Sequence, residues 1–505
     1  MSKAESETTN KEQDQYPTRR SSFSRGVFFT GSGTALNIVF LFLETMIAAR
    51  LLTPEDYGIY LLLIALVNFF VMAIDFGQRT SATQLLAASD SVKQAAVANS
   101  AWVFRLVVVA LVSILILLGQ PLISLIDSAA SLAQYTVYIP LMLVAASFDE
   151  LLLGLLQGFQ AYRRMAIAQI VRSVLRLSLT VVFLTVFDLG MVALIYSWII
   201  SFTVSAVYQF LALPISRRFV YQRPLLSEML RFGFPLQLTR FLWFAFTQVH
   251  VLLLGALAGP ASAAFYSVAA RIPKALQRLS ESYIAVYFPT TAALISRGEH
   301  RQAHRVLNQS LRLISFAAAL VALAAVLFSR EIVILVFSEK YAVSSPAFAL
   351  LMITFHVSFV LSIMGYTLTA AGYPGRSLGE NLFRTTVTII GDLVLIPIYG
   401  FMGPVFASLI AAYAANPLAI RLLRRSGITV TLAPYVKQIT LLLLGAALYW
   451  WIQPAGFVYR VAILIVFVGL NMVLATITRD DLDLVLPQIV SKRLGALIHG
   501  ISLKV

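Results

Sequence analysis

The residues best suited to bind a charged ligand lie inside otherwise apolar stretches. Arg271, Lys274, Arg278 and Glu281 follow one another at spacings of 3, 4 and 3 residues, which place all four on one face of a helix. A charge at the centre of a bilayer is costly unless it faces water or a partner. Because three of the four side chains are basic, this basic stripe predicts a wet cationic surface that lines a cavity between two lobes.

Further arginines in or beside apolar stretches are expected to join the same cationic cavity. They are Arg50, Arg105, Arg176 and Arg240. A guanidinium group grips a phosphate or diphosphate through two parallel hydrogen bonds, so an excess of such groups favours that kind of ligand. Two simpler interpretations stay open. Arg271 and Lys274 could reach the outer membrane interface, and Asp149 and Glu150 could form buried structural ion pairs with the arginines.

Acidic residues at membrane depth are candidates for carrying a coupling ion, because binding a proton or sodium ion there cancels an expensive charge. Glu281 comes first, since it shares the face of the basic stripe, and Asp392 and Asp149 follow. Glu281 could instead pair with Arg278, one helical turn away. The chain has no GxxxxGK[ST] or HExxH motif. We therefore expect a protein that is not an enzyme, with no catalytic residue, cofactor or metal.

The composition requires that much of the chain lie in lipid. The 505 residues are 59% hydrophobic and 12% charged, whereas a soluble domain is roughly 25% charged. The absence of cysteine excludes disulfides and thiolate metal sites. A spanning helix needs about 20 mostly apolar residues. Fourteen stretches fit that pattern: 28–48, 57–77, 95–118, 135–158, 166–187, 191–213, 233–255, 264–295, 305–328, 346–370, 381–397, 401–420, 438–453 and 461–477.

The distribution of basic residues predicts how these spans are oriented. Nineteen Lys and Arg residues lie in even-numbered loops and four in odd-numbered loops. Cytoplasmic loops are the ones enriched in Lys and Arg, so both termini are expected in the cytoplasm. This topology also accounts for the net charge of +15 without a nucleic-acid partner. Residues 1–26 are expected to be a disordered tail, and 478–505 an amphipathic helix on the inner leaflet.

Three pairs of segments indicate an internal repeat. Residues 53–60 align with 259–266, 156–164 with 368–376, and 189–191 with 399–401, at offsets of 206, 212 and 210. Six spans separate the copies, so both cross the membrane in the same direction. The predicted fold is therefore an all-α integral membrane protein with two six-helix lobes, related by a pseudo-twofold axis along the membrane normal, plus two C-terminal helices. The predicted segments are lobes 27–213 and 233–424, a linker 214–232, the extra helices 425–477 and the tail 478–505.

Several segments, in order along nearly the whole chain, resemble bacterial polysaccharide (Wzx-type) flippases of the multidrug/oligosaccharidyl-lipid/polysaccharide exporter superfamily. They are RLLTPEDYGIY (50–60), IDFGQRTSA (74–82), LLQGFQAYRR (155–164), RFGFPLQLTRF (231–241), AFYSVAARIP (264–273), YFPTTAALISRGE (287–299), LTAAGYPGR (368–376) and LIPIYGFMGPVFASLI (395–410). The resemblance implies fourteen helices in two lobes. It also places Arg271 where such flippases often carry a cavity base. One departure is His250, which stands where the family often has an Asp five residues before a Gly.

The resemblance also implies a substrate and a setting. The substrate would be an undecaprenyl-diphosphate-linked oligosaccharide, moved across the bacterial inner membrane by alternating access for polysaccharide biosynthesis. The implied partners are that glycan, membrane lipids and the polymerase and chain-length regulator of the same pathway. A multidrug or cation antiporter is the first alternative, but a basic cavity would repel cations. A membrane polymerase or ligase is the second, and the lack of a large exterior loop argues against it.

Overall fold

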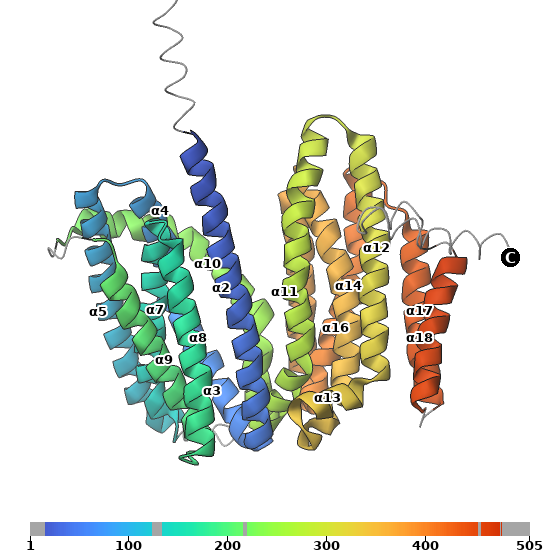
Figure 1. Ribbon diagram of the computed structural model, residues 1–505, viewed down its shortest axis with the longest axis horizontal. Coiled ribbons are helices and arrows are strands. Elements are labelled where there is room, and N and C mark those ends of the chain that lie inside the picture. Colours follow the sequence, from blue (N-terminus) through green and yellow to red (C-terminus); the bar gives the residue numbers. More distant parts are fainter. Residues whose placement is uncertain (1–15, 124–133, 216–219, 453–455, 475, 477–505) are drawn as a thin grey trace, which may run out of the picture. The chain divides into compact units, whose positions relative to one another are not determined.

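The computed structural model describes residues 16–123, 134–215, 220–452, 456–474 and 476. Most of these residues are helical. One long helix occupies each of the fourteen predicted positions (Figure 1). These helices are α2 (Tyr16–Leu51), α3 (Pro54–Ala73), α5 (Ser91–Ile123), α7 (Ile139–Gly158), α8 (Tyr162–Thr185), α9 (Met191–Ala212), α10 (Arg223–Ala258), α11 (Pro260–Ser296), α12 (His300–Leu327), α14 (Ser345–Ala370), α15 (Pro374–Tyr399), α16 (Gly403–Arg425), α17 (Leu432–Trp451) and α18 (Phe457–Val473). The prediction of an all-α membrane fold is confirmed.

Shorter elements complete the chain between these helices. They are α4 (Gln78–Ala87), α13 (Ser329–Phe337) and the 3-10 turns η2 (Thr136–Tyr138), η3 (Glu339–Ser344) and η4 (Gly400–Met402). The predicted disordered tail needs a correction, because α2 already begins at Tyr16. The rest of that tail, 1–15, and the predicted amphipathic helix 478–505 lie outside the described residues.

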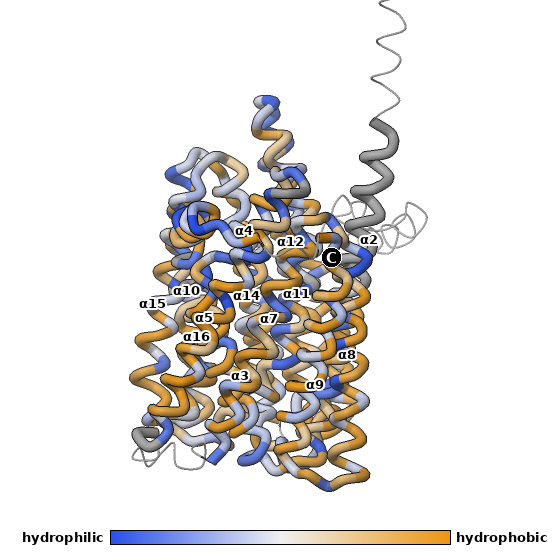
Figure 2. Tube along the Cα trace, turned by 90° about the vertical axis from the view of Figure 1, so that its left-hand side faces the viewer, coloured by the Kyte–Doolittle hydropathy of each residue, from blue (hydrophilic) through white to orange (hydrophobic). Residues whose placement is uncertain are grey.

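Most of the long helices are apolar enough to cross a bilayer. Ten described stretches meet the length and hydropathy expected of a membrane span, and one of them, 374–425, contains both α15 and α16. Figure 2 shows hydrophobic residues along most of the helical length, interrupted by isolated polar positions. The helices α10, α11 and α18 fall outside this set; α18 is shorter, and α11 carries the basic stripe. The chain is a multi-pass membrane protein.

The chain divides into two compact units, residues 1–261 and 262–505, called here the first and second unit. The predicted lobes placed the seventh span in the second lobe, whereas the structure groups α10 with the first unit, where it packs on α3, α4 and α5. A close backbone approach accounts for this packing. Gly77 has φ +70°, and a Cβ added there would lie 2.0 Å from the carbonyl oxygen of Gly233 in α10.

The backbone shows the internal repeat that the sequence predicts. Gly190, before α9, has φ 54° and ψ −139°, and Gly400, before α16, has φ 56° and ψ −130°. Both angles lie in a region that glycine adopts without strain. Helix α8 packs on α9 as α15 packs on α16, and α7 packs on α9 as α14 packs on α16. The two units therefore share a helical motif in the same chain order.

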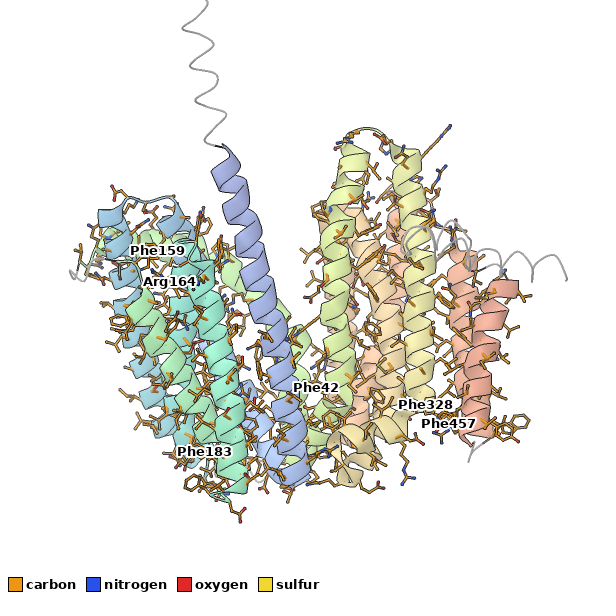
Figure 3. The ribbon with its side chains drawn as sticks, viewed as in Figure 1. Phe42, Phe159, Arg164, Phe183, Phe328 and Phe457 are labelled. Atoms are coloured by element: carbon orange, nitrogen blue, oxygen red, sulfur yellow. The ribbon has the colours of Figure 1, made fainter. Side chains whose placement is uncertain are left out.

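In the second unit, α17 and α18 pack on each other and on α12 (Figure 1). A cluster at one end of α12 and α18 fastens this pair. Figure 3 labels Phe328 and Phe457 there, and their ring centroids are 5.9 Å apart. The Arg460 guanidinium lies over the Phe328 ring and forms an ion pair of 2.5 Å with Glu331. The two C-terminal helices are thus attached through α12 and α13.

Candidate functional site

Asp75 is the centre of a buried ionic network in the first unit, just after α3. Its carboxylate accepts a hydrogen bond of 2.5 Å from Arg105 Nη2 of α5 and another from Arg240 of α10. Arg105 and Asp75 are both fully buried, and Arg105 Nε also donates to Gln78 Oε1 at 3.0 Å. The structure therefore brings together two of the predicted cavity cations, Arg105 and Arg240, around one carboxylate.

The same network continues to Glu150 of α7. Its Oε1 atom lies 2.5 Å from Arg240 Nη2 and 3.1 Å from Arg79 Nη1 of α4. Arg240 thus bridges two carboxylates, and its side chain is 31% exposed. Glu150, Arg240 and Phe244 line a small cavity of about 230 Å³ in the first unit. These contacts agree with the alternative in which Glu150 forms a structural ion pair with arginines at membrane depth.

Arg176 of α8 belongs to a second, separate ion pair. Its Nε donates to Glu44 Oε1 of α2 at 2.9 Å, and its Nη2 donates to the Tyr60 hydroxyl of α3 at 2.9 Å. Glu44 is buried. The Arg176 guanidinium therefore links α8 to α2 and α3. Because its charge is paired with Glu44, little positive charge remains there for an anionic ligand.

Asp149, a predicted coupling residue, is held in a third polar group. It forms an ion pair with Arg172 of α8 and accepts a hydrogen bond of 2.6 Å from Gln209 Nε2 of α9. The Arg172 guanidinium also lies 4.7 Å from the centre of the Phe202 ring. The structure thus supports the simpler interpretation of Asp149 as one half of a buried ion pair.

Arg50 lies apart from these groups, in the last turn of α2, and it is exposed. A cation at a helix C-terminus is stabilised by the helix dipole. Arg50 is thus placed to stabilise the C-terminus of α2, and none of the hydrogen bonds described for Asp75 and Glu150 comes from it.

The basic stripe lies in the second unit, on α11, which runs unbroken from Pro260 to Ser296 and contains Pro273. Lys274 and Arg278 are exposed and Arg271 is half-buried. Lys274 Nζ lies 5.8 Å from the centre of the Tyr266 ring, within the range of a cation–π contact. Glu281 is also exposed, and the described ion pairs include none between it and Arg278. The helix therefore carries three bases and one acid on one face.

A cavity of about 390 Å³ opens beside the Glu281 end of this stripe, wholly within the second unit. Its walls come from α11, α14 and α15, and Glu281 is part of the lining. Glu380 of α15 also lines it and is only 3% exposed. Among the described residues, no donor reaches Glu380 Oε1. We call this space the α11–α14–α15 cavity.

Sequence reasoning missed Asp75 and Glu380 as site residues. Asp75 ends a predicted span, and its role depends on partners 30 and 165 residues away in the chain. Glu380 falls just before the predicted span 381–397, yet α15 begins at Pro374. The coupling candidate Asp392 is fully buried on the same helix. In the described part of the chain, no group of three His, Asp or Glu side chains is arranged to hold a metal.

Known proteins resemble this chain in sequence. Residues 47–346 match the family described as "Polysaccharide biosynthesis protein". A relative from Haloferax volcanii, named "Probable low-salt glycan biosynthesis flippase Agl15", is 21% identical over 379 residues, which cover 74% of this chain and 78% of the relative.

Solved structures share the fold. An inward-facing multidrug resistance MATE family transporter of the MOP superfamily has a TM-score of 0.62 at 18% identity, covering 78% of this chain and 96% of that one. The lipid II flippase MurJ in an inward closed conformation has a TM-score of 0.61 at 13% identity, covering 88% and 98%. The resemblance seen in the sequence segments is confirmed. Because the family match spans more than half of its residues, the chain belongs to the polysaccharide biosynthesis protein family.

Proposed function

We propose that the protein is a flippase that moves an undecaprenyl-diphosphate-linked oligosaccharide repeat unit across the bacterial inner membrane by alternating access. The polysaccharide biosynthesis family and the glycan flippase relative support the reaction class. The observation that carries the proposal is the basic stripe on α11. Arg271, Lys274 and Arg278 offer several cations on one helix face to an anionic ligand at membrane depth.

The contrast with the first unit supports this assignment of the diphosphate. Arg105, Arg176 and Arg240 each contact a carboxylate, namely Asp75, Glu44 and Glu150. Arg79 also contacts Glu150, so the two carboxylates of the Asp75 network cancel two of its three positive charges. Arg278 is exposed, and among the described ion pairs none joins it to a carboxylate. A diphosphate binds best where guanidinium groups are not already occupied. The same surplus of positive charge disfavours a cationic drug as the substrate.

Transport with no recognisable nucleotide-binding loop must draw on an ion gradient, the membrane potential or downstream consumption of the product. We propose Glu281 as the first residue to test for coupling, because it lies on the stripe and its charge affects the field at Arg278. Asp392 is the second, since it is buried at 0% exposure on α15. The pathway polymerase and its chain-length regulator are proposed as the partners that receive the product.

The reaction is tested in cells that lack the gene. Loss of the protein should halt surface polysaccharide while the lipid-linked repeat unit accumulates in the cytoplasmic leaflet, where an added glycosidase cannot reach it. Arg271→Ala and Arg278→Ala should reproduce that phenotype, and Arg297→Ala, which removes an exposed charge beyond the end of α11, should not. Accumulation of the repeat unit on the periplasmic side would instead indicate a polymerase or ligase.

The proposed orientation places both termini in the cytoplasm. Reporter fusions after Gly298 and Val430 should read cytoplasmic, and fusions after Asp188 and Lys340 should read periplasmic. The opposite result at two or more of these positions would contradict the fourteen-span topology.

A further inference from the structure

We propose that the α11–α14–α15 cavity is a subsite for the sugar that is joined directly to the diphosphate. The inference rests on the proposed function and adds to it a second binding region with different chemistry. The basic stripe would bind the phosphates, and this cavity would bind the hydroxyl groups of the sugar. Its volume of about 390 Å³ falls in the range of roughly 300–1,000 Å³ that is typical of small-molecule pockets.

Three helices each present a polar stripe to the cavity. On α15 the lining residues Ser377, Glu380, Asn381 and Arg384 are spaced by 3, 1 and 3 residues, which keeps them on one helix face. Helices α11 and α14 contribute a similar pattern. Their polar members are Gln277, Ser280, Glu281, Ser362, Tyr366 and Thr369. Ten of the fifteen lining side chains can form hydrogen bonds, which is unusual within an apolar membrane protein.

Several hydroxyl groups in the cavity lining already donate their hydrogens within the protein, so their oxygen atoms remain available as hydrogen-bond acceptors. Ser280, Ser362 and Thr369 donate their hydroxyl hydrogens back to carbonyl oxygens of their own helices, at 3.1, 3.0 and 3.1 Å. Their oxygen lone pairs and the two glutamates remain as acceptors. Arg384 is the one cation in the lining, and its Nη2 donates to Asn381 Oδ1 at 3.2 Å. Because two carboxylates accompany this single guanidinium, the cavity carries a net negative charge and suits a phosphate poorly. A sugar carries several hydroxyl donors and suits it well.

Glu380 is the specific observation that points to a ligand. Its side chain is 97% buried, it lines the cavity, and no described donor reaches its Oε1 atom. Leaving a buried carboxylate oxygen without a hydrogen bond is costly, so natural proteins rarely keep one without a role. Two neighbouring sugar hydroxyls can donate to one carboxylate, which would satisfy this oxygen.

An aromatic ring at the cavity suits the apolar face of a sugar. Tyr366 lines the cavity and is 44% exposed. Its ring is positioned edge-to-face against Phe288, with centroids 5.9 Å apart. A fixed, partly exposed ring beside hydrogen-bond acceptors can stack on the C–H face of a pyranose while the hydroxyl groups reach the carboxylates.

The distance between the two regions matches the chemistry of a glycosyl diphosphate. Glu281 belongs to the cavity, and Arg278 of the basic stripe precedes it by three residues on α11. Three residues of α-helix advance about 4.5 Å. The first sugar of such a lipid is bonded directly to the diphosphate, so one ligand can reach both regions at once.

Binding of defined lipids to the purified full-length protein in nanodiscs tests the proposal. The probes are undecaprenyl diphosphate and the same lipid carrying one N-acetylglucosamine or one glucose. The wild type should bind a sugar-bearing lipid roughly tenfold more tightly than the sugar-free one. Glu380→Gln and Tyr366→Leu should remove that preference without changing the affinity for undecaprenyl diphosphate. Arg278→Ala should weaken all three, and Glu339→Gln, an exposed acid outside the cavity, should change none.

The binding results also distinguish a failure of the sugar subsite from a failure of the proposed function. If the wild type binds all three lipids equally, the cavity is not a sugar subsite, although the proposed function survives. If it binds none of them, the proposed function fails and the inference falls with it. If Glu380→Gln keeps the sugar preference but abolishes a sodium-dependent rise in the unfolding temperature, Glu380 is an ion site and the proposal is overturned. Should Glu380→Gln not fold, Tyr366→Leu with Ser362→Ala decides the question.

Discussion

The arginines of the first unit and the bases of the second unit differ in their surroundings. Arg105 is fully buried and held by Asp75 and Gln78, whereas Arg278 is exposed on α11. A buried guanidinium needs a carboxylate partner, because desolvation of an isolated charge is prohibitive. Sequence alone treats both as cations at membrane depth. The comparison teaches that the partner, rather than the depth, decides which basic residue can still bind an anion.

Removal of Arg105 should give the largest loss of stability. Arg105→Ala leaves Asp75 with Arg240 alone and opens a buried hole, so we expect a loss of about 3–5 kcal/mol in the free energy of unfolding. The measurement is the unfolding temperature of purified protein in detergent, with Arg297→Ala as the matched surface control. An unchanged unfolding temperature combined with lost export would place Arg105 in the binding site and break the comparison.

Gly77→Ala should give the next largest loss of stability. The residue has φ +70°, and its added Cβ would collide with the carbonyl oxygen of Gly233 at 2.0 Å. Overpacking of this kind typically lowers the free energy of unfolding by about 1–3 kcal/mol. The left-handed backbone at this position, which disfavours alanine, lowers it further. Gly298→Ala is the control, since it also has positive φ but has nothing within 4 Å of an added Cβ. Equal unfolding temperatures for the two variants would argue against the close packing of α10 on the turn before α4.

These two cases show how far the sequence could predict the structure. The positions of the fourteen helices follow from local hydropathy, so α11 was expected at 264–295 and found at Pro260–Ser296. The partner of Arg240 could not be predicted, because Asp75 lies 165 residues away. Glu380 was missed because polar residues 374–381 resemble a loop, yet the helix starts at Pro374. Hydropathy reports burial in lipid and carries no information about which charges meet.

Arg278→Ala should separate function from folding. The side chain is exposed, so the free energy of unfolding should change by no more than about 0.5 kcal/mol. Loss of a charge-assisted hydrogen bond of about 2 kcal/mol should lower affinity for undecaprenyl diphosphate roughly thirtyfold. Arg278→Lys should rescue poorly, because an ammonium group cannot bind bidentately. A drop in stability equal to that of Arg105→Ala would show that Arg278 is structural.

Glu281→Gln should have the smallest effect on folding and a selective effect on transport. The carboxylate is exposed and has no described ion-pair partner on α11. If it carries the coupling ion, the variant should lose the dependence of transport on the proton or sodium gradient in proteoliposomes. If rate and gradient dependence both match the wild type, the coupling site lies elsewhere, and Asp392→Asn is the next variant to test.

Flipping by the purified protein shows directly whether the basic stripe binds the diphosphate during transport. Proteoliposomes containing a fluorescent undecaprenyl-diphosphate-linked oligosaccharide are quenched from outside, and the fraction that becomes accessible is followed with time. We expect rapid exchange with the wild type and with Arg297→Ala. We expect no exchange above protein-free vesicles with the folded double variant Arg271→Ala/Arg278→Ala. Exchange at the wild-type rate by that double variant would contradict the claim that the basic stripe on α11 carries the diphosphate.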